Sequence, residues 1–225
     1  MLIKKKIGVL QMGMAATQLY IDLLNSKQNQ QLEGSSFFTL HQTNFEEIND
    51  LLPQRSRELD QLIEKYLREV LNMEIAALLV PNITLHETID GIWGKLETKV
   101  QLLHPIYGVI KSLKEKGLSE AVIFGSAYTM TSTYIKRTFI DEDIRATPPS
   151  QKDINTLDEL RRNIYSQKSV STSQEKLEEL ISTYADKKLV VLACTEFSSI
   201  KNRDNYNCID MAHVQVDAGL SILTI

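Results

Sequence analysis

The sequence predicts an α/β protein of two similar lobes, each a parallel sheet flanked by helices, with a ligand cleft between the lobes. Short apolar runs typical of strands alternate with longer helical patterns along the 225 residues, an order typical of parallel sheets with right-handed crossovers. The pattern starts again near His104, and the strand-end segments LLVPNIT and LVVLACTE of the two halves resemble each other. We therefore expect one lobe from residues 1–103 with 210–225 and a second lobe from residues 104–209.

The first half of the chain contains both strand and helix patterns. The run IAALLV at Ile75–Val80 is too short for a helix and apolar on both faces, as an interior parallel strand is. The segment Glu58–Met73 repeats apolar residues at intervals of three and four, with charges on the other face, which predicts an amphipathic helix. The same reasoning predicts strands at Ile7–Leu10, Ser36–His41 and Val100–His104, and helices at Ala15–Asn25 and Thr88–Leu96.

The second half repeats this alternation. A helix is expected at Ile106–Lys116, where Gly117 supplies a common C-terminal cap. The two prolines within Thr147–Ser150 predict a loop. Further strands are expected at Ala121–Gly125, Leu189–Ala193 and Cys208–Ile209, and further helices at Tyr128–Phe139, Asp153–Ser166, Glu175–Tyr184 and Ala212–Leu223.

The composition is that of a folded chain, with 43% hydrophobic residues, 9 glycines and 5 prolines. A formal net charge of −4 gives no general attraction to phosphate backbones or anionic lipid, so neither a nucleic acid nor a membrane is an expected partner. No apolar run reaches the ~18–20 residues of a membrane span. Two cysteines are too few for a disulfide framework or a zinc site, so we expect a cytoplasmic protein with no metal site.

Ligands of open parallel sheets bind outside the carboxyl ends of the strands. Interior strands are expected to end at Val80, Phe124 and Ala193, and each is followed by small or polar residues. The loop Gln11–Ala16 follows the first strand in the same way. These four segments are therefore the candidate site.

Cys194 is the first candidate for chemistry, because the N–H groups of the helix after its strand can favour a thiolate. Thr195 could donate a hydrogen bond to a substrate carboxylate, and Glu196 is an acid in the first helical turn. The alternative is a buried strand-end cysteine that packs as a small hydrophobic residue. Cys208, before the last helix, is expected to be structural.

A nucleophilic cysteine of the hydrolase kind needs an imidazole partner, and His86 and His104 both follow expected strands. Either of them could instead be a structural histidine. The sequence has no P-loop, G-x-G-x-x-G or G-x-S-x-G motif, so phosphoryl transfer and dinucleotide chemistry are not expected.

Two of these segments resemble motifs of a known family. FGSAYTM at Phe124–Met130 is similar to a G-T-x-x-T-M loop, and ACTE at Ala193–Glu196 is similar to a second catalytic-cysteine loop, of the cofactor-independent aspartate/glutamate racemases. The resemblance covers nearly the whole chain. It also includes Gly8, Thr17 and Tyr20, NFEEI at Asn44–Ile48 and IDMA at Ile209–Ala212.

The resemblance implies two pseudo-symmetric α/β lobes with substrate between them and the last helix returning to the first lobe. It also implies proton transfer at the α-carbon of aspartate or glutamate by two thiols on opposite faces, with no pyridoxal phosphate or other cofactor. Family members are often dimers, so a homodimer that binds a small amino acid or carboxylate is implied.

The chain departs from the family in the first catalytic loop, where C-N-T-x-H is replaced by Asn82-Ile83-Thr84-Leu85-His86. Asn82 stands at the position of the first cysteine and, unlike a thiol, cannot exchange a proton near neutral pH. The loop Gln11–Met14 differs from the family's G-G-M-x, and Met211 replaces the Thr or Ser that follows the aspartate.

These matches and departures predict a racemase-like isomerase of an acidic amino acid. Two alternatives stay open: a one-base enzyme on a small carboxylate, similar to a decarboxylase, and a non-catalytic relative that binds a small carboxylate or a protein partner. The predicted catalytic positions are Cys194, Asn82 and His86. The predicted substrate-binding residues are Thr17, Thr84, Ser126, Thr129, Thr195 and Met12.

Overall fold

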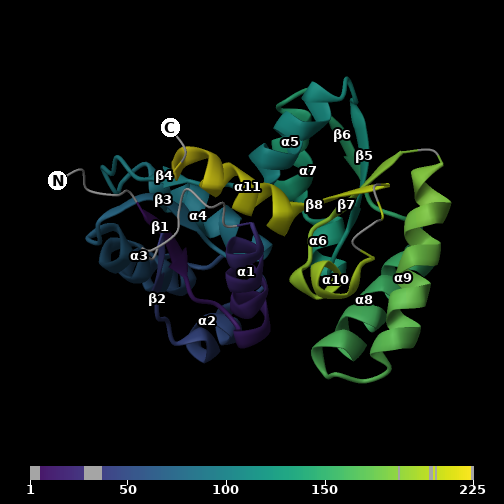
Figure 1. The fold of residues 1–225 in the computed structure, drawn as a ribbon, viewed down its shortest axis with the longest axis horizontal. Coiled ribbons are helices and arrows are strands. Elements are labelled where there is room, and N and C mark those ends of the chain that lie inside the picture. Colours follow the sequence, from purple (N-terminus) through teal and green to yellow (C-terminus); the bar gives the residue numbers. More distant parts are fainter. Residues whose placement is uncertain (1–5, 28–36, 187, 203–204, 206, 224–225) are drawn as a thin grey trace. The chain divides into compact units, whose positions relative to one another are not determined.

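The computed structural model describes residues 6–27, 37–186, 188–202, 205 and 207–223. The chain divides into two compact units, Met1–His104 with Gln215–Ile225 and Pro105–Val214. Each unit contains its own sheet (Figure 1). The first residue of the expected strand Ser36–His41 lies outside the described residues.

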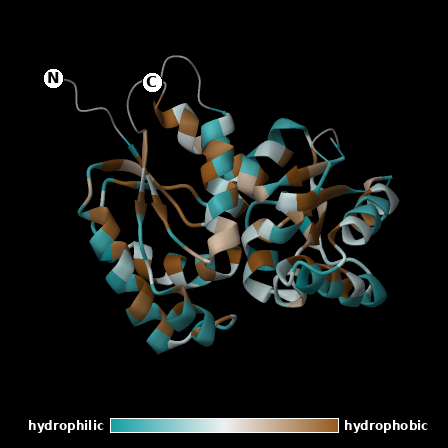
Figure 2. Cartoon of the chain, turned by 60° about the horizontal axis from the view of Figure 1, so that its bottom comes forward, coloured by the Kyte–Doolittle hydropathy of each residue, from teal (hydrophilic) through white to brown (hydrophobic). Residues whose placement is uncertain are grey.

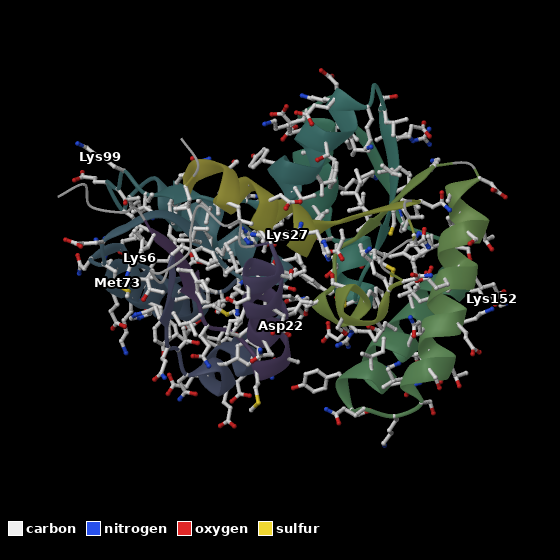
Figure 3. The ribbon with its side chains drawn as sticks, in the orientation of Figure 1. Lys6, Asp22, Lys27, Met73, Lys99 and Lys152 are labelled. Carbon is white, nitrogen blue, oxygen red and sulfur yellow. The ribbon has the colours of Figure 1, made fainter. Side chains whose placement is uncertain are left out.

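The first unit is built on a four-stranded sheet with the strand order β2-β1-β3-β4. All neighbouring strands are parallel, and Gly8 is aligned with Thr39 on one side and with Leu78 on the other. The strands are β1 (Lys6–Leu10), β2 (Phe38–His41), β3 (Ile75–Leu79) and β4 (Gln101–Leu102). Lys6, Met73 and Lys99, at or just before strand starts, lie on one side of this unit, its amino edge (Figure 3).

Helices cover both faces of the first sheet. Their bounds are α1 (Met14–Ser26), α2 (Phe45–Leu51), α3 (Arg57–Leu71), α4 (His86–Trp93) and α11 (Met211–Leu223), with a 3₁₀ turn η2 (Ile83–Leu85) before α4. Ile63 and Leu67 of α3 pack in one cluster with Leu78 of β3, on the face that α2 and α4 also cover. Gly219 of α11 lies against Ile7, whose side chain points to the other face.

The second unit has the sheet order β6-β5-β7-β8, again with parallel neighbours throughout. The strands are β5 (Glu120–Phe124), β6 (Arg145–Thr147), β7 (Leu189–Leu192) and β8 (Cys208–Asp210). The helices are α5 (Pro105–Glu115), α6 (Ala127–Thr131), α7 (Thr133–Ile140), α8 (Gln151–Tyr165), α9 (Val170–Ala185) and α10 (Thr195–Ile200). Helices α8 and α9 lie side by side and pack on Val122, Phe124 and Leu192 (Figure 1).

These sheets confirm the predicted α/β class. Figure 2 shows hydrophobic residues along the strands of each unit, while the helices carry hydrophobic and hydrophilic residues on different parts of their surface. This distribution follows from the burial of each sheet between helices. Within the described residues, no helix combines the length and the apolar character that crossing a membrane requires.

Some expected boundaries were wrong. The helix expected at Tyr128–Phe139 is two helices, because Ser132 adopts φ −59° and ψ 125° and its hydroxyl accepts a hydrogen bond from the N–H of Ile135. The segment expected to be a loop from Thr147 contains the end of β6, a strand too short to show an apolar run. Helix α9 begins at Val170 rather than at Glu175. Helices α2 and α10 were not expected as elements of their own.

Candidate functional site

The loop after β3 is held by Asn82. Its side-chain Oδ1 accepts a hydrogen bond of 3.0 Å from the backbone N–H of Thr84, and this bond caps the η2 turn. An asparagine oxygen satisfies an orphan N–H at a helix start in the same way. Asn82, which the resemblance aligns with the first cysteine of the racemases, therefore stabilises the turn. Its amide has no accessible pKa.

His86 lies beneath this loop and is fully buried. Its ring packs edge-to-face on the ring of His104, with 4.4 Å between centroids, and His104 Nε2 lies 3.4 Å from Asp90 Oδ1. Among the residues that the structure describes, neither ring nitrogen of His86 makes a hydrogen bond of good geometry, although the backbone of Val80 is near enough to act on its pKa. Burial, and then the neighbouring His104, lower the pKa of His86 well below its ordinary value. A catalytic role for His86 stays a prediction, and this geometry favours a packing role.

The loop after β1 is closed by Thr17. The Thr17 hydroxyl donates to the carbonyl of Met12 at 3.1 Å and accepts from the N–H of Met12 at 3.0 Å. Met12 is 2% exposed and packs in the core of the first unit, which places its side chain in the interior. Gly13 faces the ring of Phe45, where a Cβ atom would lie at 3.0 Å. Thr17 thus fixes the loop, and the substrate-binding roles of Thr17 and Met12 stay predictions.

In the second unit, the loop after β5 begins helix α6. The Ser126 hydroxyl accepts from the N–H of Thr129 at 3.1 Å and lies 2.9 Å from the Thr129 hydroxyl. The N–H of Ala127 donates to Asp158 Oδ1 at 3.0 Å, so a carboxylate of the protein already occupies that donor. A Cβ atom on Gly125 would lie 3.1 Å from the carbonyl oxygen of Ala193, which explains the glycine where β5 and β7 end side by side.

Cys194 occupies the N-cap position of α10, with φ −155° and ψ 125°. Its Sγ donates to Glu196 Oε2 at 2.9 Å, and the Thr195 hydroxyl donates to the same oxygen at 3.3 Å. The thiol is half-buried at the carboxyl end of β7. One carboxylate oxygen therefore accepts hydrogen bonds from both the Cys194 thiol and the Thr195 hydroxyl.

The helix start alone does not make Cys194 a thiolate. Burial and the Glu196 carboxylate raise the pKa of the Cys194 thiol well above its ordinary value, although the N–H groups of Phe197 and Glu196 act in the other direction. The free protein therefore holds Cys194 as a neutral thiol near neutral pH. Burial also raises the pKa of Cys208, to about 11.

Two residues near the Cys194 turn had no role predicted from the sequence. The Ser198 hydroxyl lies 3.1 Å from the carbonyl oxygen of Cys194 and 2.8 Å from Asp210 Oδ1. Ser198 follows Cys194 at the i+4 spacing of a helix, and Asp210 ends the strand beside β7. The i+4 spacing would have identified Ser198 once α10 was recognised, whereas Asp210 lies on the separate strand β8.

Chemically, the group around Cys194 can hold and deliver a proton at one sulfur atom. The loop around Asn82 offers an amide, the Thr84 hydroxyl and backbone groups, but no thiol. The structure thus places a thiol at the carboxyl end of β7 in the second unit and an amide side chain in the loop after β3 of the first.

Solved structures share this fold over almost the entire chain. A candidate Asp/Glu racemase from Yersinia pestis aligns with a TM-score of 0.83 at 19% identity, over 98% of this chain and 100% of that one. An aspartate racemase homologue from Pyrococcus horikoshii gives a TM-score of 0.78 at 16% identity, over 98% and 100%. The Picrophilus torridus aspartate racemase gives 0.75 at 19% identity, over 98% and 94%.

No protein-family model matches the sequence, and no curated protein matches it. The link to these racemases therefore depends on the shared fold, at low sequence identity, and on the resemblance of the loops Phe124–Met130 and Ala193–Glu196. The chain has the fold of the aspartate/glutamate racemases.

Proposed function

We propose that this protein is a cofactor-independent, racemase-like isomerase that moves a proton at the α-carbon of aspartate or glutamate. The observation that carries the proposal is the contact between the Cys194 thiol and the Glu196 carboxylate at the carboxyl end of β7. In an open parallel sheet, this edge is where ligands bind. The fold and the loop resemblance supply the substrate class.

The thiol must first become a thiolate to act as a base. Glu196 Oε2 already accepts the hydrogen bond of the thiol, so it is placed to take the proton from Sγ. The thiolate then takes the α-proton of the substrate, and the S–H bond that forms holds that proton for its return. Charge that develops on the substrate carboxylate needs hydrogen-bond donors, and the hydroxyls of Thr195 and Ser126 are the donors we assign to it.

Inversion needs a second proton donor on the opposite face of the α-carbon. Asn82 cannot supply one, and its Oδ1 is engaged with the N–H of Thr84. This observation favours the second candidate function, a one-base reaction in which the proton leaves and returns on one face. Such an enzyme exchanges the α-proton of one enantiomer faster than it racemises it.

The test is to incubate the protein with L-aspartate, and separately with L-glutamate, in deuterated water. Proton NMR follows loss of the α-proton signal, and chiral chromatography follows the appearance of the D-enantiomer. Exchange with slower inversion supports the one-base reaction, and equal rates support a two-base racemase. If neither amino acid exchanges, the protein does not perform this chemistry and a non-catalytic binding role gains support.

We also propose a cytoplasmic homodimer without a metal or an organic cofactor, as the family resemblance implies. Light scattering coupled to size-exclusion chromatography measures the oligomeric state directly. A mass of one chain at micromolar concentration would contradict the dimer.

A further inference from the structure

The Ser198 hydroxyl lies between two acceptors that belong to different elements. One is the carbonyl oxygen of Cys194, 3.1 Å away at the start of α10, and the other is Asp210 Oδ1, 2.8 Å away at the end of β8. A serine hydroxyl has one hydrogen, so it donates to only one of them at a time. The N–H of Ser198 also donates to the Cys194 carbonyl, as a helical bond.

Asp210 is a buried carboxyl group, 5% exposed. Its Oδ1 accepts from Ser198 and from the N–H of Ala212 at 2.9 Å. Its Oδ2 has no hydrogen-bond partner within the described part of the chain, and His213 Nε2 stands 3.9 Å from it. The titratable or charged groups facing this carboxyl are His213 on α11, Lys201 at the end of α10 and Cys208 on β8.

We propose that Asp210 is a positioning residue for the Cys194 turn and that it acts through the Ser198 hydroxyl. The inference deepens the proposed function, because it names the group that sets the geometry of the proposed acid/base thiol. The hydrogen bonds of Asp210 go to Ser198 and Ala212 and not to the Cys194 thiol. Its influence passes through the hydrogen bonds at Ser198.

The protonation state of Asp210 decides where the Ser198 hydrogen points. An ionised carboxylate is the stronger acceptor, so it draws the hydroxyl away from the Cys194 carbonyl. A proton on Oδ1 turns that oxygen into a donor to Ser198 Oγ, and the hydroxyl hydrogen is then free for the Cys194 carbonyl. The turn that carries the thiol is held by a second hydrogen bond only in this protonated form. Burial raises the pKa of Asp210, which brings this change closer to neutral pH.

The reactivity of Cys194 reports this coupling without any need for enzymatic turnover. In a Cys208→Ser background, the rate of alkylation by iodoacetamide is measured at closely spaced pH values. The alkylation rate rises with pH because the thiol ionises. In addition, we expect this rate to change in a step of about 2- to 10-fold over the pH range where Asp210 ionises, which is the size of effect that one hydrogen bond gives. The rate is expected to be higher on the alkaline side, where the Cys194 carbonyl has lost the hydroxyl.

Two substitutions remove this step by different routes. Asp210→Asn keeps an oxygen that accepts from Ser198 but does not titrate, and Ser198→Ala leaves Asp210 titrating but breaks its link to Cys194. The control is Ser199→Ala, on the same helix, whose hydroxyl donates to the carbonyl of Glu196 at 2.7 Å and not to Asp210. Circular dichroism verifies that each variant is folded.

The proposal predicts the step in the parent and in Ser199→Ala, and its loss in Asp210→Asn and in Ser198→Ala. A step that persists in Ser198→Ala, or a parent profile without any step, overturns it. In the α-proton exchange assay, kcat should show the same step while KM does not. If no variant exchanges α-protons, the proposed function fails, whereas the alkylation profile still decides the role of Asp210.

Discussion

The Cys194 thiol donates a hydrogen bond to the Glu196 carboxylate, with Sγ and Oε2 2.9 Å apart. This contact stabilises the neutral thiol, because a thiolate beside a carboxylate would place two negative charges together. It also gives the thiol proton a destination. In the proposed reaction, the Glu196 carboxylate takes this proton before the sulfur acts as a base.

Glu196→Gln tests the pair directly. The substitution removes the negative charge that raises the pKa of Cys194, so the pKa is expected to fall and the thiolate fraction at neutral pH to rise. Alkylation of Cys194 should become about 3- to 10-fold faster at pH 7.5, as a shift of up to about one pKa unit gives. Glu175→Gln, an exposed site on α9, is the matched control. An unchanged alkylation rate in Glu196→Gln would show that the carboxylate does not control the thiol.

Asn82→Cys should have two opposing effects. The variant loses the side-chain cap on the N–H of Thr84, which is expected to lower the free energy of unfolding by about 1 kcal/mol. It also supplies a second thiol, so the ratio of inversion to α-proton exchange should rise. Asn82→Ser retains a capping oxygen without a thiol and is expected to leave that ratio unchanged. If Asn82→Cys does not raise the ratio, the altered loop Gln11–Met14 becomes the larger defect.

His86 should make the protein sensitive to mild acid. Its pKa is lowered in the folded state, so the unfolded chain takes up the proton first, and stability is present above pH 6.5 and lost as the pH falls below it. Urea unfolding of the parent and of His86→Leu, each at pH 7 and at pH 5, measures how much unfolding free energy each protein loses between the two pH values. The parent should lose about 2 kcal/mol more than the variant between these values. Equal losses would mean that His86 takes up its proton as easily when folded.

Asp210 should show the opposite trend. Burial raises its pKa above the ordinary 3.8, so its favourable contribution is present below that value and is lost as the pH rises through the folded-state pKa. Asp210→Asn, which does not ionise, should therefore gain on the order of 1 kcal/mol relative to the parent between pH 4 and pH 8. Urea unfolding at both pH values measures the difference, with the exposed Asp186→Asn as control. A relative gain that shrinks as the pH rises would contradict the assignment.

The α/β class and the strand ends could be predicted because they depend on local patterns. The apolar run at Ile75–Val80 and the amphipathic stripe at Glu58–Met73 each identify their element without knowledge of the rest of the chain. The break at Ser132 was missed because the flanking residues continue the helical pattern and only the hydroxyl cap marks the boundary. The short strand β6 has too few residues to show a period.

The protonation of Cys194 could not be predicted, because it depends on where side chains point. A helix start lowers a thiol pKa only where burial and nearby carboxylates have weaker effects. At Cys194 they are stronger, because the burial of the thiol is the largest effect and the Glu196 side chain turns back toward the sulfur. The cap formed by Asn82 also depends on the exact turn after β3. In contrast, the position of Cys194 at the carboxyl end of a parallel strand was predicted from the sequence, because the apolar run Leu189–Ala193 marks that strand.

The most direct test of the central claim is the rate of α-proton exchange in deuterated water for the parent, Cys194→Ser and Cys208→Ser. Each protein is incubated with the amino acid that the parent exchanges faster, and the α-proton signal is followed by NMR at a fixed enzyme concentration. We predict that Cys194→Ser loses at least about 100-fold in rate, the scale of a general acid–base group, while Cys208→Ser stays within about 2-fold of the parent. Equal rates in the parent and in Cys194→Ser would contradict the assignment of Cys194 as the acid/base group.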